Sequence, residues 1–245
     1  MSYCVGLRLN RGLVFMSDTR TNAGVDNVSM FKKMFTWERE GERVITVLTA
    51  GNLATTQAVV SLLDERAKAP HDRDPDIMAA PSMFQIAKLV GETLTEVIGA
   101  HSASGQKADS PFAASIIVGG QIRGGEPRLF LVYPEGNFIE ASGDTTFFQI
   151  GETKYGKPII IRAYNPDMSF EDAIKLLLVS FDSTIRANIS VELPIDLQVY
   201  ETDSFKVGTS RRVERDDAYF QLISSQWGKA LQTAFDSLPR YSFDG

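Results

Sequence analysis

Two short stretches rich in apolar, strand-forming residues open the chain, at 3–9 and 12–18. Between them, Asn10-Arg11-Gly12 is typical of a hairpin turn, in which glycine eases the reversal of the chain. We therefore expect two antiparallel strands. Such a hairpin places Ser2 and Asp18 at the same end of the paired strands.

A second pair of such stretches covers residues 31–37 and 43–49 and flanks Glu40-Gly41-Glu42. This repeated pattern predicts a second hairpin. After it, Gly51-Asn52 precedes helix-forming sequence from about 53 to 68. The first third of the chain is thus expected to run from two hairpins into a helix.

Helical spacing of apolar residues recurs in three later segments. Ser82 is a candidate N-cap of a helix over 82–100, and Ser169 of a helix from about 169 to 187. The last segment, about 211–236, predicts an amphipathic helix that either covers this domain or docks on a neighbouring chain. Further strands are expected at 112–119, 128–133, 137–141, 146–150 and 193–201.

Two groups of strands, each with helices after it, predict an α+β fold with two stacked sheets enclosed by helices on both outer faces. The 245 residues and the hydrophobic fraction of 43% suit one large domain over 1–245. The polar segments 69–75 and 101–111 connect elements and do not read as linkers between domains.

Charge and cysteine content narrow the class of function. A formal net charge of −6 and a pI near 5.1 argue against binding to nucleic acid or a membrane surface, since either needs a clustered basic face. The single cysteine, Cys4, excludes an intrachain disulfide, is expected in the core, and fits a reducing compartment, with the cytoplasm as the default. No apolar run approaches the roughly 20 residues that span a bilayer, and we expect neither secretion nor a cleaved signal peptide.

Metal and cofactor chemistry finds little support in the sequence. The two histidines, His71 and His101, lie in polar loops. Their spacing does not match a zinc site, and the sequence around them does not indicate a Ser-His-Asp triad. Glycine-bearing turns at 119–125 and 150–156 match neither common phosphate-binding pattern. We therefore expect no cofactor and no metal.

Ser2 matters because serine is small enough for the initiator methionine to be removed. The mature chain would then begin with a hydroxyl nucleophile beside its own base, the free α-amino group. An α-amino group titrates near neutral pH and can therefore accept the hydroxyl proton. This is the chemistry of an N-terminal nucleophile hydrolase, and the alternative is that Ser2 reflects methionine processing alone.

The residues that follow carry a family resemblance. Asp18-Thr19-Arg20, Ala23-Gly24, Lys32-Lys33 and Thr49-Ala50-Gly51, at their spacing from Ser2, resemble the β subunits of the 20S proteasome and the bacterial protease HslV. Residues 20–27 and 48–57 resemble most closely the bacterial proteasome homologues of the Anbu, or ancestral β-subunit, family. The resemblance implies a four-layer αββα sandwich and an assembly of identical chains, as a ring or an open spiral.

The same resemblance implies roles for four residues around Ser2. Lys33 is the ammonium that stabilises charge on the nucleophile, and Asp18 keeps it charged and oriented. Arg20 supports the site loop, and Gly51 offers its backbone N–H to the oxyanion. The alternatives are, respectively, an exposed lysine, a hairpin-end cap or an ion pair with Arg20, a surface salt bridge, and an ordinary strand-to-helix turn.

A substrate pocket is also implied, and it is expected to be largely apolar. Its lining positions by resemblance are Thr21, Phe31, Phe35, Thr49 and Leu53. Core packing is the alternative for each of them.

Two later positions depart from the proteasome pattern. Gly151-Glu152 stands where those subunits carry Gly-Ser, and Ala187-Asn-Ile-Ser190 stands where they carry Asp-x-x-Ser. The serine is thus retained as Ser190, while the aspartate is missing. Glu152 either accepts a hydrogen bond from the N-terminal ammonium or is a solvated loop residue.

These residues predict a peptidase or amidase that cleaves peptide or protein amide bonds through Ser2. Serine lacks the methyl group that restricts χ1 of threonine, so slow or selective catalysis is expected. Two alternatives are a proteasome-fold scaffold with weak or no activity and a hydrolase of small-molecule amides. No unfolding partner is indicated.

Overall fold

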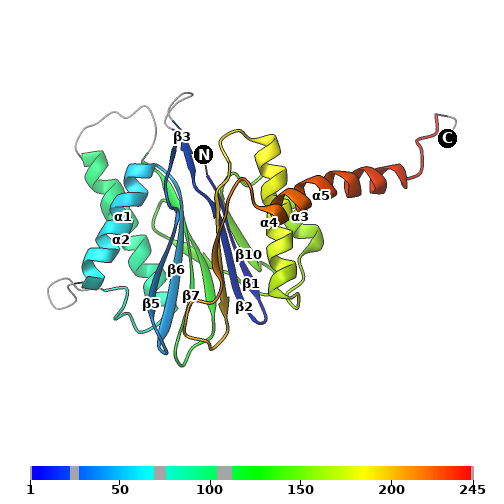
Figure 1. Cartoon of the computed structure of the whole chain (residues 1–245). Coiled ribbons are helices and arrows are strands. Elements are labelled where there is room, and N and C mark those ends of the chain that lie inside the picture. The colour runs from blue at the N-terminus through cyan, green and yellow to red at the C-terminus, as the bar shows by residue number, and fades with distance from the viewer. Residues whose placement is uncertain (1, 23–27, 69–75, 104–111, 244–245) are drawn as a thin grey trace.

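The computed structural model describes residues 2–22, 28–68, 76–103 and 112–243, and it has four layers (Figure 1). Two antiparallel sheets of five strands stack face to face. The first has the order β10-β1-β2-β11-β12 and the second β5-β6-β7-β8-β9. A separate two-stranded ribbon, β3 (Arg20–Asn22) and β4 (Val28–Met30), stands at one end of the sandwich.

The strands of the second sheet include the two longest, β6 and β7, with nine residues each. Those of the first sheet are β1 (Tyr3–Leu9), β2 (Gly12–Asp18), β10 (Phe147–Gly151), β11 (Ile195–Glu201) and β12 (Ser210–Val213). Those of the second are β5 (Met34–Arg39), β6 (Arg43–Gly51), β7 (Ala114–Ile122), β8 (Arg128–Val132) and β9 (Phe138–Glu140).

Helices cover the outer face of each sheet. Helices α1 (Leu53–Lys68) and α2 (Met83–Ala103) lie on the second sheet, and α3 (Lys157–Ala163) and α4 (Phe170–Ala187) lie on the first (Figure 1). Helix α5 (Ala218–Asp236) starts against α4 and then extends away from the body of the molecule. In the described ranges, no helix is long and apolar enough to cross a membrane.

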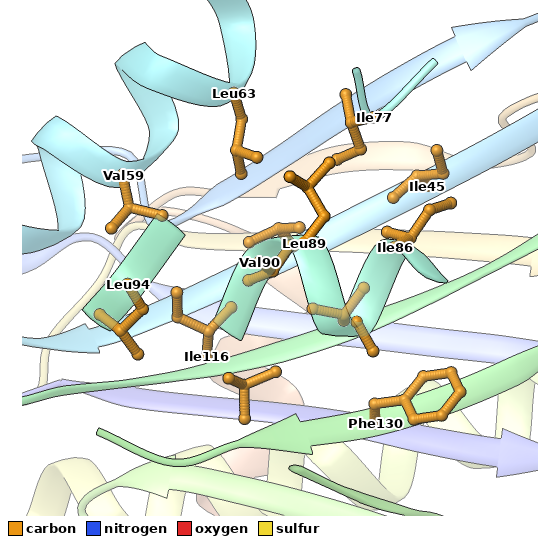
Figure 2. Close-up of a cluster of buried hydrophobic side chains, with 14 of the residues drawn as sticks. Ile45, Val59, Leu63, Ile77, Ile86, Leu89, Val90, Leu94, Ile116 and Phe130 are labelled. Atoms are coloured by element: carbon orange, nitrogen blue, oxygen red, sulfur yellow. The ribbon is translucent and has the colours of Figure 1, made fainter. Parts of the chain in front are cut away.

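Three apolar clusters correspond to the three interfaces between the four layers. The cluster under α1 and α2 combines helix residues such as Leu63 and Val90 with strand residues such as Ile45 and Phe130 (Figure 2). A second cluster lies between the first sheet and α3 and α4, and a third lies between the two sheets. Burial on both faces explains why β1 and β2 read as nearly continuous apolar runs.

Most of the expected elements are present. The first hairpin has the predicted bounds, and the predicted caps are confirmed: Ser82 Oγ accepts from the Gln85 N–H at 3.2 Å, and Ser169 Oγ accepts from the Asp172 N–H at 3.0 Å. The αββα layering is therefore as the sequence predicted. The connector at 69–75 and residues 104–111 of the expected loop lie outside the described residues, while residues 101–103 of that loop are helical and end α2.

Four predicted boundaries are wrong by three residues or more. The strand expected to end at 119 ends at Ile122, and the helix expected to end at 100 ends at Ala103. The strand expected from residue 31 begins at Met34, because residues 31–33 cross from the ribbon to the second sheet. The helix expected from residue 211 begins at Ala218, after the N-cap Asp217, because residues 210–213 pair with β11 at the edge of the first sheet. The ribbon and the seven-residue α3 were not predicted.

Candidate active site

Ser2 is held by its main chain at the start of β1. Its carbonyl oxygen accepts a hydrogen bond from the Glu152 N–H at 2.6 Å, directly after β10. Gly151 has φ +83°, and a Cβ built on it would lie 1.9 Å from the same oxygen. This close approach admits only glycine at 151. Ser2 itself is 8% exposed and lies at the end of the three paired strands β10, β1 and β2.

Asp18 and Lys33 form a buried ion pair beside Ser2. Lys33 Nζ lies 2.7 Å from Asp18 Oδ1, and the two side chains are 5% and 0% exposed. Lys33 Nζ also donates to the Arg20 carbonyl oxygen at 2.5 Å, and the Tyr3 N–H donates to Asp18 Oδ1 at 2.9 Å. The end of β2, the ribbon and the segment before β5 are thereby joined at one point.

Burial raises the pKa of Asp18 to about 6, while the Lys33 ammonium acts in the opposite direction. The carboxylate is therefore ionised at neutral pH, and its charge balances that of Lys33. Acidification through pH 6 protonates it. The ion pair is thus a neutral-pH feature of the site.

A cavity of about 320 Å³ contains Ser2 in its wall. Its lining residues are Ser2, Thr21, Lys32, Lys33, Phe35, Thr49, Ala50, Gly51, Asn52, Leu53, Ala54, Thr56 and Gln57. The structure therefore brings four of the five expected pocket residues together with Ser2, Lys33 and Gly51. Phe31 is not part of the lining, and the wall mixes hydroxyl, amide and ammonium groups with apolar ones, so it is less apolar than expected.

Gly51 ends β6 in the wall of this cavity and has φ +122°. A Cβ built there would lie 2.5 Å from the Ala113 carbonyl oxygen, so the conformation again requires glycine. Asn52 follows, and its Oδ1 accepts from the Thr55 N–H at 3.2 Å, which starts α1 beside the cavity.

Arg20 contributes its backbone to the ion pair and its side chain to a different contact. The guanidinium lies 3.8 Å from Glu192 Oε2, and Arg215 approaches the same carboxylate at 3.6 Å. Arg20 therefore links the ribbon to the segment before β11. The salt bridge that the sequence offered as an alternative is present and partly buried, and the supporting role of Arg20 stays a prediction.

Glu152 is buried at 7% exposure and is not a solvated loop residue. Its Oε1 accepts from the Lys154 N–H at 2.9 Å, and its Oε2 accepts from Asn188 Nδ2 at 2.8 Å. Asn188 Oδ1 in turn accepts from the Ser190 N–H at 2.9 Å. Ser190 thus connects to the Ser2 turn through backbone and amide contacts, and it does not line the cavity.

Cys4 lies behind the site and is part of the core between the sheets. Its Sγ donates to the Thr49 carbonyl oxygen at 3.6 Å, and burial raises the pKa of the thiol. The thiol is therefore a packed, neutral group.

Sequence reasoning missed Lys32, Asn52, Thr56, Gln57 and Asn188. A signal existed for two of these residues: Thr56 and Gln57 lie three and four positions after Leu53, which places them on one helix face. Nothing local distinguished Asn188, whose partner Glu152 is 36 residues away.

Comparisons with known proteins agree with this geometry. A family model described as proteasome subunit matches residues 2–197. The proteasome subunit beta 2 of Pyrobaculum calidifontis is 27% identical over 199 residues, which cover 80% of this chain and 87% of that protein.

Solved structures give a closer match. An Anbu (Gly-1) mutant from Hyphomicrobium sp. strain MC1 has a TM-score of 0.91 and 48% identity, with 99% of this chain and 100% of that chain covered. The helical assembly of the Anbu complex from Pseudomonas aeruginosa has a TM-score of 0.92 and 46% identity, with 99% of each chain covered. The chain thus belongs to the proteasome subunit family and, within it, to the Anbu (ancestral β-subunit) proteins.

Proposed function

We propose that this proteasome-like protein hydrolyses peptide amide bonds and that its nucleophile is the Ser2 hydroxyl, exposed at the N-terminus after Met1 is removed. The single observation that carries the proposal is the buried Asp18–Lys33 pair at a cavity that contains Ser2. A buried ammonium held by a carboxylate is costly to keep. The position of the Lys33 ammonium in the wall of this cavity is explained if negative charge develops on the substrate there during the reaction.

The proposed reaction uses these groups in sequence. Ser2 Oγ bonds to the substrate carbonyl carbon while its proton passes to the α-amine, and Lys33 and the Gly51 N–H stabilise the negative charge. The C–N bond then breaks, and the leaving amine takes the proton from the α-ammonium. Water attacks the resulting ester with the α-amine as base, which releases a carboxylic acid and restores Ser2.

We also propose that identical chains assemble through α5. Apolar side chains on and beyond this helix are exposed, namely Leu222, Leu231, Phe235, Leu238, Tyr241 and Phe243. At its base lies a groove of about 490 Å³ between α3, α4 and α5 with an apolar wall that includes Leu176 and Trp227. A second copy is the occupant we favour, because the Pseudomonas aeruginosa relative forms a helical assembly and exposed apolar surface of this kind marks interfaces.

The test uses an α′,β′-epoxyketone peptide, which joins a terminal hydroxyl and its own α-amine into one ring. Intact mass of the full chain is expected to show loss of Met1 and one adduct per chain. Ser2→Ala should form no adduct, and Ser2→Thr should retain it. Retention of Met1, or the absence of an adduct with every peptide, would contradict the proposal and favour a scaffold.

A further inference from the structure

The cavity beside Ser2 carries an uncompensated positive charge. Two lysines, Lys32 and Lys33, stand in its wall, and no carboxylate is among the described residues that line it. Asp18 neutralises Lys33 from behind. Lys32 forms no ion pair with any described residue, so its charge acts on whatever enters the cavity.

Lys32 is set against the apolar part of the wall. Its Nζ lies 5.6 Å from the centroid of the Phe35 ring, within the range of a cation–π contact. The aromatic face holds the ammonium at the cavity, although the side chain is exposed. The side chain is therefore directed by Phe35 and still free to bind an anion.

The neighbouring basic residues are already paired. Lys32 also lines an adjoining cleft with Arg211 and Arg212. Arg212 binds Asp196 through two bonds of 2.7 and 3.0 Å, and Arg211 binds Asp217. Among the described residues that line either space, Lys32 is thus the basic side chain without a carboxylate partner.

We infer that the cavity selects an acidic side chain, aspartate or glutamate, on the residue whose carbonyl Ser2 attacks, and that Lys32 determines this specificity. The inference rests on the proposed function. Hydroxyl and amide groups from Thr21, Thr49 and Gln57 supply further polar partners in the same wall. The net charge of −6 repels acidic peptides from the protein in general. The local positive charge of Lys32 would attract an acidic side chain into the cavity.

The experiment compares four epoxyketones that differ only in the residue next to the warhead: Glu, Gln, Leu and Lys. The rate of adduct formation on the full chain is followed by intact mass. Glu should react about five- to tenfold faster than Gln, its neutral counterpart of equal shape. This ratio should fall toward one at high salt, because Lys32 is exposed and its charge is screened.

Two variants assign the effect to Lys32. Lys32→Gln should bring the ratio of the Glu and Gln rates to about one, and Lys32→Glu should make Lys the faster reagent. Lys68→Gln is the matched control, because Lys68 is an exposed lysine on α1 that lines neither space. Its ratio should equal that of the unaltered chain.

The outcomes separate the two proposals. If no reagent forms an adduct, the proposed function fails and this inference falls with it. If adducts form but Glu and Gln react equally, or if Lys32→Gln leaves the preference in place, the function stands and the acidic specificity is wrong.

Discussion

Asn188 Nδ2 donates to Glu152 Oε2 at 2.8 Å and thereby joins the end of α4 to the turn that holds Ser2. Glu152 is buried, and each of its carboxylate oxygens has one hydrogen-bond donor. The contact thus ties the turn after β10, whose Glu152 N–H binds the Ser2 carbonyl oxygen, to the end of α4.

Asn188→Ala should lower the free energy of unfolding by about 1–3 kcal/mol, because it leaves a buried carboxylate oxygen without its donor. Asn188→Asp should cost more, since it sets a second negative charge against Glu152. Urea denaturation at one protein concentration measures both. Asn10→Ala, which removes an exposed amide contact to Asp167, serves as the control and should cost less than 1 kcal/mol.

Removing one partner of the buried ion pair should be strongly destabilising. Lys33→Met leaves Asp18 buried and unpaired, and a loss of about 3–5 kcal/mol is expected. The double variant Lys33→Met with Asp18→Leu should regain much of that stability while it still fails to form the epoxyketone adduct. A double variant that reacts like the unaltered chain would show that the pair has no chemical role.

The pKa of Asp18 predicts a pH dependence of stability. It is about 6 in the folded chain, against an ordinary value of 3.8, so the folded state binds this proton more tightly than the unfolded state. The stabilising contribution of protonation is full below about pH 4 and is lost as the pH rises through 6. As the pH rises from 4 to 7, the unaltered chain should therefore lose stability relative to Asp18→Asn, whose side chain does not titrate. Unfolding free energies of the two chains measure this difference. Parallel curves would contradict the raised pKa.

Gly151→Ala should destabilise the chain and abolish adduct formation, because its Cβ would overlap the Ser2 carbonyl oxygen. Gly124 provides a matched control: its φ is +88°, close to the +83° of Gly151, but a Cβ there meets no atom within 4 Å. Gly124→Ala should cost about 1–2 kcal/mol of backbone strain and leave the adduct unchanged. Thermal unfolding and intact mass measure the two effects.

Charge on the exposed apolar face of α5 should disrupt assembly. Phe235→Asp places a carboxylate on a side chain that is 70% exposed in the single chain, and the assembled form should then elute at a smaller size in light-scattering chromatography. Ser225→Asp adds the same charge at an exposed polar position of the same helix. Equal effects of both variants would argue against an interface through the apolar face.

What the sequence predicts well is what neighbouring residues determine. The first hairpin follows from its own residues and turn, and the caps Ser82 and Ser169 follow from local spacing. Strand β12 escaped prediction because pairing with β11 makes residues 210–213 extended, and their pattern alone does not.

In the candidate site, too, the sequence predicted some residues and missed the contacts that only the fold creates. The family pattern selected Lys33 from the Lys32-Lys33 pair, and Lys33 is buried while Lys32 is exposed. That Lys33 contacts Asp18 was predicted from the family pattern, because no periodicity relates a strand residue to a loop residue 15 positions later. The contact between Glu152 and Asn188 carries no sequence signal, since the fold alone brings them together.

The carbonyl of Ser2, and not its side chain, is what Glu152 and Gly151 hold in place. The identity of the atom on Cβ is therefore independent of the contacts that locate the residue. A thiol from cysteine, or the hydroxyl of threonine, would stand at the same point of the cavity without rebuilding the strands around it. The backbone contacts at position 2 are therefore compatible with either a hydroxyl or a thiol as the side-chain group that faces the cavity.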